Sequence, residues 1–226
     1  MLMEKVSGAL VGDVFDAPSR EAVLDSARVL ARLHQIAPDE IVPTLRESMN
    51  RAPTASELRA HVTELQQLWQ THSRAHSVTM DAVFAWLQAN VDQLRPLVTV
   101  VHGDYSYHNL LFVGDELSAV MDWELVHIGH PAEDVGYIRG AVLTQVPWPD
   151  FMAAYREAGG PELEERDVIF YALLGKLRLI ALLFRARQYF ESGQTDDLQI
   201  ADVCVFHMTR LVHQCSMEMR TLPRRW

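Results

Sequence analysis

The sequence predicts a mainly α protein with one small β-hairpin, an α+β fold in a single domain. Three observations carry this prediction. Apolar residues recur at helical spacing over most of the chain, short β-branched runs are confined to its middle, and no Pro-, Gly- or Ser-rich linker divides it. The 226 residues, 49% of them hydrophobic, are enough to bury a sizeable core.

Three amphipathic helices are expected in the first hundred residues. The first, over residues 18–37, ends before Pro38 and has one face formed by Val23, Ala27, Leu30 and His34. Thr54 and Glu57 have the spacing of a capping box, which predicts the start of the second helix. The third helix ends at Pro96.

The middle of the chain predicts three short strands, over residues 97–101, 109–113 and 117–121. The last two form a hairpin, because residues 114–116 (GDE) supply a turn between them. Beyond the hairpin the pattern predicts helices near 133–143, 149–158, 163–191 and 197–218.

Composition excludes several classes of function. A formal net charge of −10 and a pI near 5.4 argue against nonspecific binding to nucleic acid or to anionic membranes. The longest apolar run, residues 168–184, is interrupted by Gly175, Lys176 and Arg178, which favours a buried helix over a membrane span. Cys204 and Cys215 lie too far apart on one helix for a disulfide, so a cytoplasmic location is expected.

Polar side chains gather at both ends of the predicted hairpin. They are His102, Asp104, His108 and Asn109 on one side and Asp122 and Glu124 on the other. Because a hairpin returns on itself, Asn109 and Asp122 should lie close together. A carboxamide beside a carboxylate suits Mg²⁺, which usually keeps its other positions for water and substrate phosphates. Asp104 would then accept a proton from a hydroxyl that attacks the phosphate.

"HGDYSYHN" (102–109) followed by "VMDWE" (120–124) resembles the catalytic loop and metal-binding motif of the aminoglycoside phosphotransferase (phosphotransferase enzyme) family. This family is related to choline kinases and has a protein-kinase-like fold. The resemblance continues through "GHPAEDVGYI" (129–138), and "DWELVHIGHPAED" is most similar to the branch associated with acyl-CoA dehydrogenases. It implies an ATP- and Mg²⁺-dependent transfer of phosphate to a hydroxyl of a small molecule.

The resemblance also implies roles for individual residues. Asp104 would be the catalytic base, and His102 would orient the loop that carries it. Asn109 and Asp122 would be the Mg²⁺ ligands, and Asp134 a structural brace for the loop. The adenine ring would be held by a hinge strand, through the backbone of Met3, Glu4 and Lys5.

The same resemblance predicts that residues 1–8 are the remnant of the hinge strand and residues 9–226 a kinase-like helical C-lobe, with the catalytic loop and hairpin at 97–124. The N-lobe is absent from this sequence, and neither Lys5 nor Lys176 matches its phosphate-binding lysine. We therefore expect the 226-residue chain to be inactive alone. An open strand edge at residues 1–6 would favour self-association.

Two other classes of function remain open from the sequence. The chain could be a catalytically silent C-lobe that binds a metabolite or a protein. It could also be a metal-dependent hydrolase that uses Asp104, Asn109 and Asp122 with nearby histidines. The spacing of those histidines, His108, His127 and His130, fits no common zinc pattern. The identity of the acceptor alcohol cannot be read from the sequence.

Overall fold

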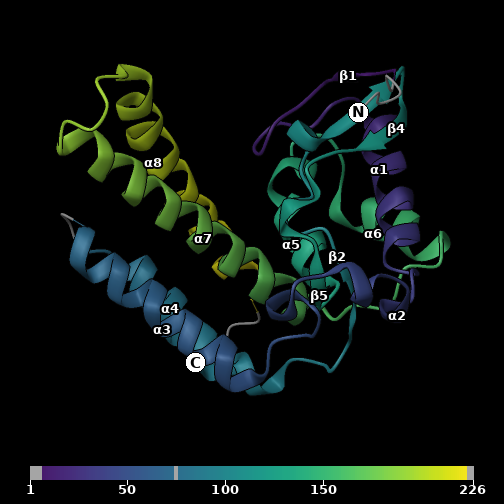
Figure 1. Cartoon of the computed structure of the whole chain (residues 1–226), viewed down its shortest axis with the longest axis horizontal. Coiled ribbons are helices and arrows are strands. Elements are labelled where there is room, and N and C mark those ends of the chain that lie inside the picture. The colour runs from purple at the N-terminus through teal and green to yellow at the C-terminus, as the bar shows by residue number, and fades with distance from the viewer. Residues whose placement is uncertain (1–6, 74–75, 223–226) are drawn as a thin grey trace. The chain divides into compact units, whose positions relative to one another are not determined.

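The computed structural model of the chain describes residues 7–73 and 76–222 (Figure 1). The chain folds into two compact units, each made of two separate segments. The first unit comprises residues 1–52 and 95–168, and the second comprises residues 53–94 and 169–226. The fold is mainly helical with small antiparallel sheets, as the sequence predicted.

The first unit contains every strand of the described residues. Its helices are α1 (Arg20–Leu33), α2 (Pro38–Ile41), α5 (Ala132–Val142) and α6 (Trp148–Glu157), with short 3-10 helices at Val42–Thr44, Glu47–Met49, Tyr107–Asn109 and Trp123–Leu125. The strands are β1 (Ala9–Leu10), β2 (Thr99–Val101), β3 (Leu110–Val113), β4 (Glu116–Val120) and β5 (His127–Gly129).

These strands form two small antiparallel sheets, one with the order β1-β3-β4 and one of β2 and β5. The predicted hairpin is confirmed as β3 and β4, and Gly114 has the positive φ of +61° that its tight turn requires. Strands β1 and β5 were not predicted. Each is only two or three residues long, so neither has enough residues to show an alternating pattern.

Helix α1 packs against α6 and forms one wall of the first unit's core. Ser19 caps its N-terminus by accepting a hydrogen bond from the backbone of Ala22 at 3.2 Å. The predicted apolar face is confirmed, because Val23, Ala27, Leu30 and His34 are all buried. Ser26 on the same helix is also buried.

All the regular secondary structure in the described part of the second unit is helical. It contains α3 (Ala55–His72), α4 (Val78–Asn90), a 3-10 helix at Val91–Gln93, most of α7 (Glu165–Glu191) and α8 (Leu198–Thr221). The capping box of α3 is confirmed, with Thr54 and Glu57 bonded to each other's backbone. Cys204 and Cys215 are free thiols on α8, as predicted. Within residues 7–73 and 76–222, no helix is long and apolar enough to cross a membrane.

Candidate functional site

Two tyrosine side chains anchor the loop between β2 and β3, residues 102–109, to helix α1. Tyr105 and Tyr107 are both fully buried. The hydroxyl of Tyr105 donates to the backbone carbonyl of Ser26 on α1 at 2.9 Å, and the hydroxyl of Tyr107 lies 3.3 Å from the Ser26 hydroxyl. Because both rings anchor the loop to α1, the polar residues between and beside them are held in defined positions.

Asp134, in the first turn of α5, binds the backbone at the start of this loop. Its Oδ2 accepts a hydrogen bond from the amide of His102 at 2.8 Å, and its Oδ1 accepts one from the amide of Gly103 at 2.9 Å. Gly103 has a φ of +86°, and a Cβ at this position would lie 2.6 Å from the carbonyl oxygen of Leu125. A glycine is therefore required where the loop turns toward Asp104.

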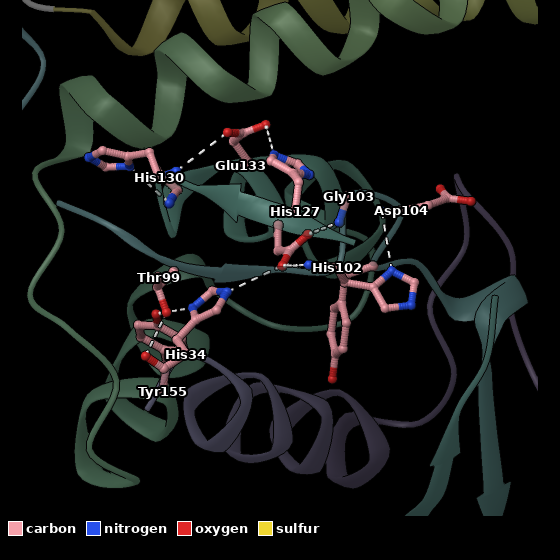
Figure 2. Close-up of polar contacts among 12 residues, drawn as sticks. His34, Thr99, His102, Gly103, Asp104, His127, His130, Glu133 and Tyr155 are labelled. Atoms are coloured by element: carbon pink, nitrogen blue, oxygen red, sulfur yellow. Dashed lines mark hydrogen bonds and ion pairs between the residues drawn. The ribbon is translucent and has the colours of Figure 1, made fainter. Parts of the chain in front are cut away.

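A second layer of buried side chains supports Asp134 (Figure 2). Nε2 of His34, the C-terminal cap of α1, lies 3.2 Å from Asp134 Oδ2, and its Nδ1 lies 2.5 Å from the hydroxyl of Tyr155 on α6. Thr99 on β2 donates to the carbonyl oxygen of His34 at 2.7 Å. Sequence analysis placed His34 on a core face and did not connect it with Asp134, and it did not identify Tyr155.

The ring of His102 connects the loop to the end of β4. Its Nδ1 accepts a hydrogen bond from the amide of Asp104 at 3.2 Å, so Nε2 carries the proton and donates to the carbonyl of Met121 at 2.9 Å. The ring is fully buried and lies edge-on to Trp123, with 4.7 Å between ring centroids. These contacts support the loop-orienting role expected of His102.

The Asp104 carboxylate points away from His34, Thr99 and Tyr155 (Figure 2). Its Oδ2 accepts hydrogen bonds from Asn109 Nδ2 at 2.9 Å and from His108 Nε2 at 3.2 Å. Its Oδ1 is buried without a hydrogen-bond partner among the described residues. Burial raises the pKa of Asp104, but the side chains of His108, Tyr137 and Asn109 stabilise its charged form and hold the pKa below its ordinary value.

Asn109 and Asp122, the predicted metal ligands, lie at the open end of the β3–β4 hairpin. The register pairs Leu110 with Val120, and the amide of Met121 donates to the carbonyl of Asn109 at 2.8 Å. Asn109 Nδ2 donates to both the carbonyl and the carboxylate of Asp104, which leaves its Oδ1 as the atom for a cation.

Asp122 is exposed and follows β4 in a left-handed conformation, with φ +59°. It is the one non-glycine residue with positive φ among residues 7–73 and 76–222. Such a conformation costs energy in a residue with a side chain, and it recurs at functional sites. A carboxylate and a carboxamide oxygen are donors that suit Mg²⁺ when phosphates complete its coordination.

Each of the three histidines considered for a zinc site has a carboxylate near its ring, and Glu133 also accepts a hydrogen bond from the backbone amide of His130 at 3.4 Å. Each lies against a different carboxylate: His108 Nε2 at 3.2 Å from Asp104, His127 Nε2 at 3.4 Å from Glu133, and His130 Nε2 at 3.8 Å from Asp167. The described residues contain no group of three or more His, Cys, Asp or Glu side chains that could hold a metal.

The predicted adenine-binding residues Met3, Glu4 and Lys5 lie outside the described residues, as does the strand edge expected at residues 1–6. The hinge, the self-association through it and the boundary between residues 8 and 9 therefore remain predictions. Strand β1, which follows this segment, pairs with β3 through Ala9 and Leu10.

Comparisons with known proteins point to one family. The sequence model described as "Phosphotransferase enzyme family" matches residues 1–169. Mouse acyl-CoA dehydrogenase family member 10 is 29% identical over 128 residues, which are 53% of this chain and 11% of that protein. The rat family member 11 is 32% identical over 72 residues, which are 31% of this chain and 9% of that protein. The chain thus spans a small part of these relatives.

Two solved structures share the fold. A protein of Ralstonia eutropha assigned as an aminoglycoside phosphotransferase is 22% identical with a TM-score of 0.72, and the match covers 98% of this chain and 73% of that one. An aminoglycoside phosphotransferase solved with GDP and kanamycin is 15% identical with a TM-score of 0.63, covering 96% of this chain and 69% of that one.

Proposed function

Because the chain belongs to the phosphotransferase enzyme family, we propose that it serves the transfer of the γ-phosphoryl group of ATP to a hydroxyl of a small molecule. The observation that carries the proposal is the state of the Asp104 carboxylate. One oxygen is held by two hydrogen bonds, and the other is buried with no partner in the described part of the chain. A buried polar atom without a partner is rare in native proteins, and at a catalytic loop it indicates a ligand.

In the proposed mechanism, Asp104 Oδ1 accepts the proton of the acceptor hydroxyl as its oxygen attacks the γ-phosphorus. The lowered pKa keeps Asp104 ionised at neutral pH, so the carboxylate positions the hydroxyl before the transfer. Asp134 holds the backbone on one side of Asp104, and His102 joins the loop to β4. The acceptor therefore meets a preorganised carboxylate.

Asn109 Oδ1 and the Asp122 carboxylate would hold Mg²⁺. When bound with the nucleotide, Mg²⁺ would supply positive charge that neutralises charge on the phosphates. Asn109 contributes to both functions, because its Nδ2 fixes Asp104 while its Oδ1 remains for the cation.

We infer that the 226-residue chain is inactive, or nearly so, when it is alone. No lysine or arginine occurs between residues 97 and 138, the stretch that includes the loop, the hairpin and Asp134. Phosphoryl transfer needs cationic groups on the phosphates, and loss of one such contact costs on the order of 10²–10³ in rate. Those groups would have to come from outside residues 97–138.

The acceptor remains to be identified among alcohols of small molecules. Relatives in this family include a protein solved with kanamycin, and the chain also matches acyl-CoA dehydrogenase family members. An aminoglycoside, choline and a hydroxyacyl compound therefore form a rational first panel. We further propose a cytoplasmic location, which the two free thiols of α8 support.

The alternatives predict different results in one assay. The full natural protein is supplied with γ-labelled ATP and the panel of acceptors, with and without Mg²⁺. We expect label on an acceptor, or on water when no acceptor is added, only with Mg²⁺. Nucleotide binding without any transfer would favour a silent binding module. Hydrolysis of phosphoesters without ATP would favour a hydrolase.

A further inference from the structure

His108 is the least explained polar residue of the 102–109 loop. The resemblance that predicted roles for His102, Asp104 and Asn109 predicted none for His108. In the structure its Nε2 lies 3.2 Å from Asp104 Oδ2, and its side chain is 35% exposed. Its Nδ1 is buried without a hydrogen-bond partner among the described residues. The bond that the ring makes is therefore the one to the proposed catalytic base.

The backbone around His108 fixes where its ring can lie. His108 is the central residue of the 3-10 turn Tyr107–Asn109, which the amide of Asn109 closes by donating to the carbonyl of Ser106 at 2.8 Å. Tyr107 and Asn109 on either side are both buried. Neither neighbour can move without disturbing the core, so the imidazole is presented to Asp104 from a rigid segment.

The Asp104 carboxylate needs such a contact. The final torsion of an aspartate is broad, so a carboxylate held by a single hydrogen bond can still rock about its Cβ–Cγ bond. Asn109 Nδ2 uses one N–H on the Asp104 carbonyl at 3.0 Å and the other on Oδ2 at 2.9 Å, and the Tyr137 side chain also stabilises the charged carboxylate. His108 supplies the second donor on the same oxygen.

We propose that His108 is a positioning residue, which holds Asp104 Oδ2 so that Oδ1 faces the acceptor hydroxyl. The inference rests on the proposed function, since it assigns a role within that reaction. Without His108, the carboxylate would rotate more freely about its Cβ–Cγ bond. Oδ1 would then face the acceptor hydroxyl for a smaller fraction of the time. The effect should fall on the chemical step and leave nucleotide binding unchanged.

Three substitutions in the full natural protein separate this role from a structural one. His108→Leu removes the donor. His108→Asn keeps an amide donor close to the position of Nδ1, too short to reach Asp104, and His108→Gln places an amide donor near the position of Nε2. We expect kcat to fall about tenfold in His108→Leu and His108→Asn, with KM for the nucleotide unchanged, and to remain near wild type in His108→Gln.

A matched control is available in the second unit. His76 Nε2 lies 2.8 Å from Asp81 in another histidine–aspartate contact, but both side chains are exposed. His76→Leu should leave kcat unchanged. A wild-type kcat in His108→Leu, or equal losses in His108→Leu and His108→Gln, would overturn the inference.

A spectroscopic measurement on the 226-residue chain tests the contact without any activity. In ¹⁵N spectra of the histidine rings, His108 should carry a proton on Nε2, and this signal should shift in Asp104→Asn. An Nε2 signal that does not change in Asp104→Asn would overturn the inference whatever the kinetics. A wild-type full protein that transfers no phosphate would instead contradict the proposed function, so the two failures are distinguishable.

Discussion

The two units of the molecule bury polar groups in different ways. The first unit buries eleven polar or charged residues among those described: Ser26, His34, Thr99, His102, Ser106, Asn109, His130, Glu133, Asp134, Arg139 and Asp167. The described part of the second unit buries two, Lys176 and Glu218, which pair with each other. The described part of the second unit has an apolar helical core with one buried ion pair, whereas the core of the first contains many buried hydrogen-bonding groups.

The difference indicates which unit carries the chemistry. Burying a polar group costs free energy unless each of its hydrogen bonds is replaced, so an extensive buried network is retained where it positions something. In the first unit, five of the buried residues lie on or directly against the 102–109 loop: Ser26, His102, Ser106, Asn109 and Asp134. Substitutions in the two units should therefore have different consequences.

The largest effect on stability is expected from breaking the ion pair of the second unit. Lys176 Nζ on α7 lies 3.2 Å from Glu218 Oε1 on α8, and both side chains are about 5% exposed. Lys176→Ala leaves the Glu218 carboxylate buried without its cation, which typically costs about 3–5 kcal/mol. Chemical denaturation measures this cost, and hydrogen exchange should show faster opening of α7 and α8.

The double variant Lys176→Met/Glu218→Leu is the control for that experiment. Because it removes both charges and keeps the volume, we expect its stability to be close to wild type or higher. If Lys176→Ala lowers the free energy of unfolding by less than about 1 kcal/mol, the ion pair contributes little to stability. The difference between the two units in how they bury polar groups would then matter less for stability.

Asp134→Asn tests the hydrogen-bonded network of the first unit. In asparagine, an NH₂ group replaces one of the two carboxylate oxygens, and this group cannot accept a hydrogen bond from a backbone N–H. At least one of the bonds from the amides of His102 and Gly103 is therefore lost. Bonds to a charged acceptor contribute about 1.5–3 kcal/mol each, and we expect a loss of about 2–3 kcal/mol. The amides of His102 and Gly103 should exchange faster with solvent.

Asp150→Asn is the matched control, because Asp150 forms a 2.8 Å ion pair with Arg20 on the surface of the same unit. It should cost less than about 1 kcal/mol. If the two variants are equally stable and the His102 amide exchanges at the wild-type rate, the bracing role of Asp134 is wrong.

A smaller effect is expected from His130, through pH. Burial lowers the pKa of His130 to about 4, aided by the nearby Arg95 and His34. Its folded pKa is below the unfolded value of about 6.5, so the unfolded chain binds more protons between pH 6.5 and 4. Stability should therefore be complete above pH 6.5 and decrease by about 2 kcal/mol between pH 7 and 5.

The comparison of wild type with His130→Gln isolates this contribution, because Asp167 and Glu133 titrate in both proteins. We expect the variant to lose less stability than wild type on the same change of pH. Urea denaturation at the two pH values measures it, and equal losses in the two proteins would show that His130 is accessible to protons in the folded state.

The sequence predicted the elements whose signals are local. The capping box of Thr54 and Glu57, the turn at Gly114 and the apolar face of α1 are each decided within a few residues, and all three are present. Strand β5 depends on pairing with β2, about 25 residues away along the chain, and its own three residues carry no signal. Tertiary pairing creates such strands, so a local pattern cannot reveal them.

The same distinction applies to the site. The grouping of Asp104, Asn109 and Asp122 could be predicted because one short loop and one hairpin connect these residues. The contact between His34 and Tyr155 joins residues 121 positions apart, and the bond from His34 to Asp134 spans 100. A histidine at the end of an apolar face was the available signal, because a buried imidazole needs polar partners.

The assignment of Asp104 as base and Asp122 as metal ligand is the central claim, and one experiment tests it most directly. Turnover and Mg·ATP affinity are measured for Asp104→Asn and Asp122→Ala in the full natural protein. We predict that Asp104→Asn lowers turnover by ~10²–10⁴ and leaves nucleotide affinity unchanged, whereas Asp122→Ala weakens both, because Asp122 would hold the Mg²⁺ that neutralises charge on the phosphates. Small and equal effects of the two substitutions would contradict the assignment.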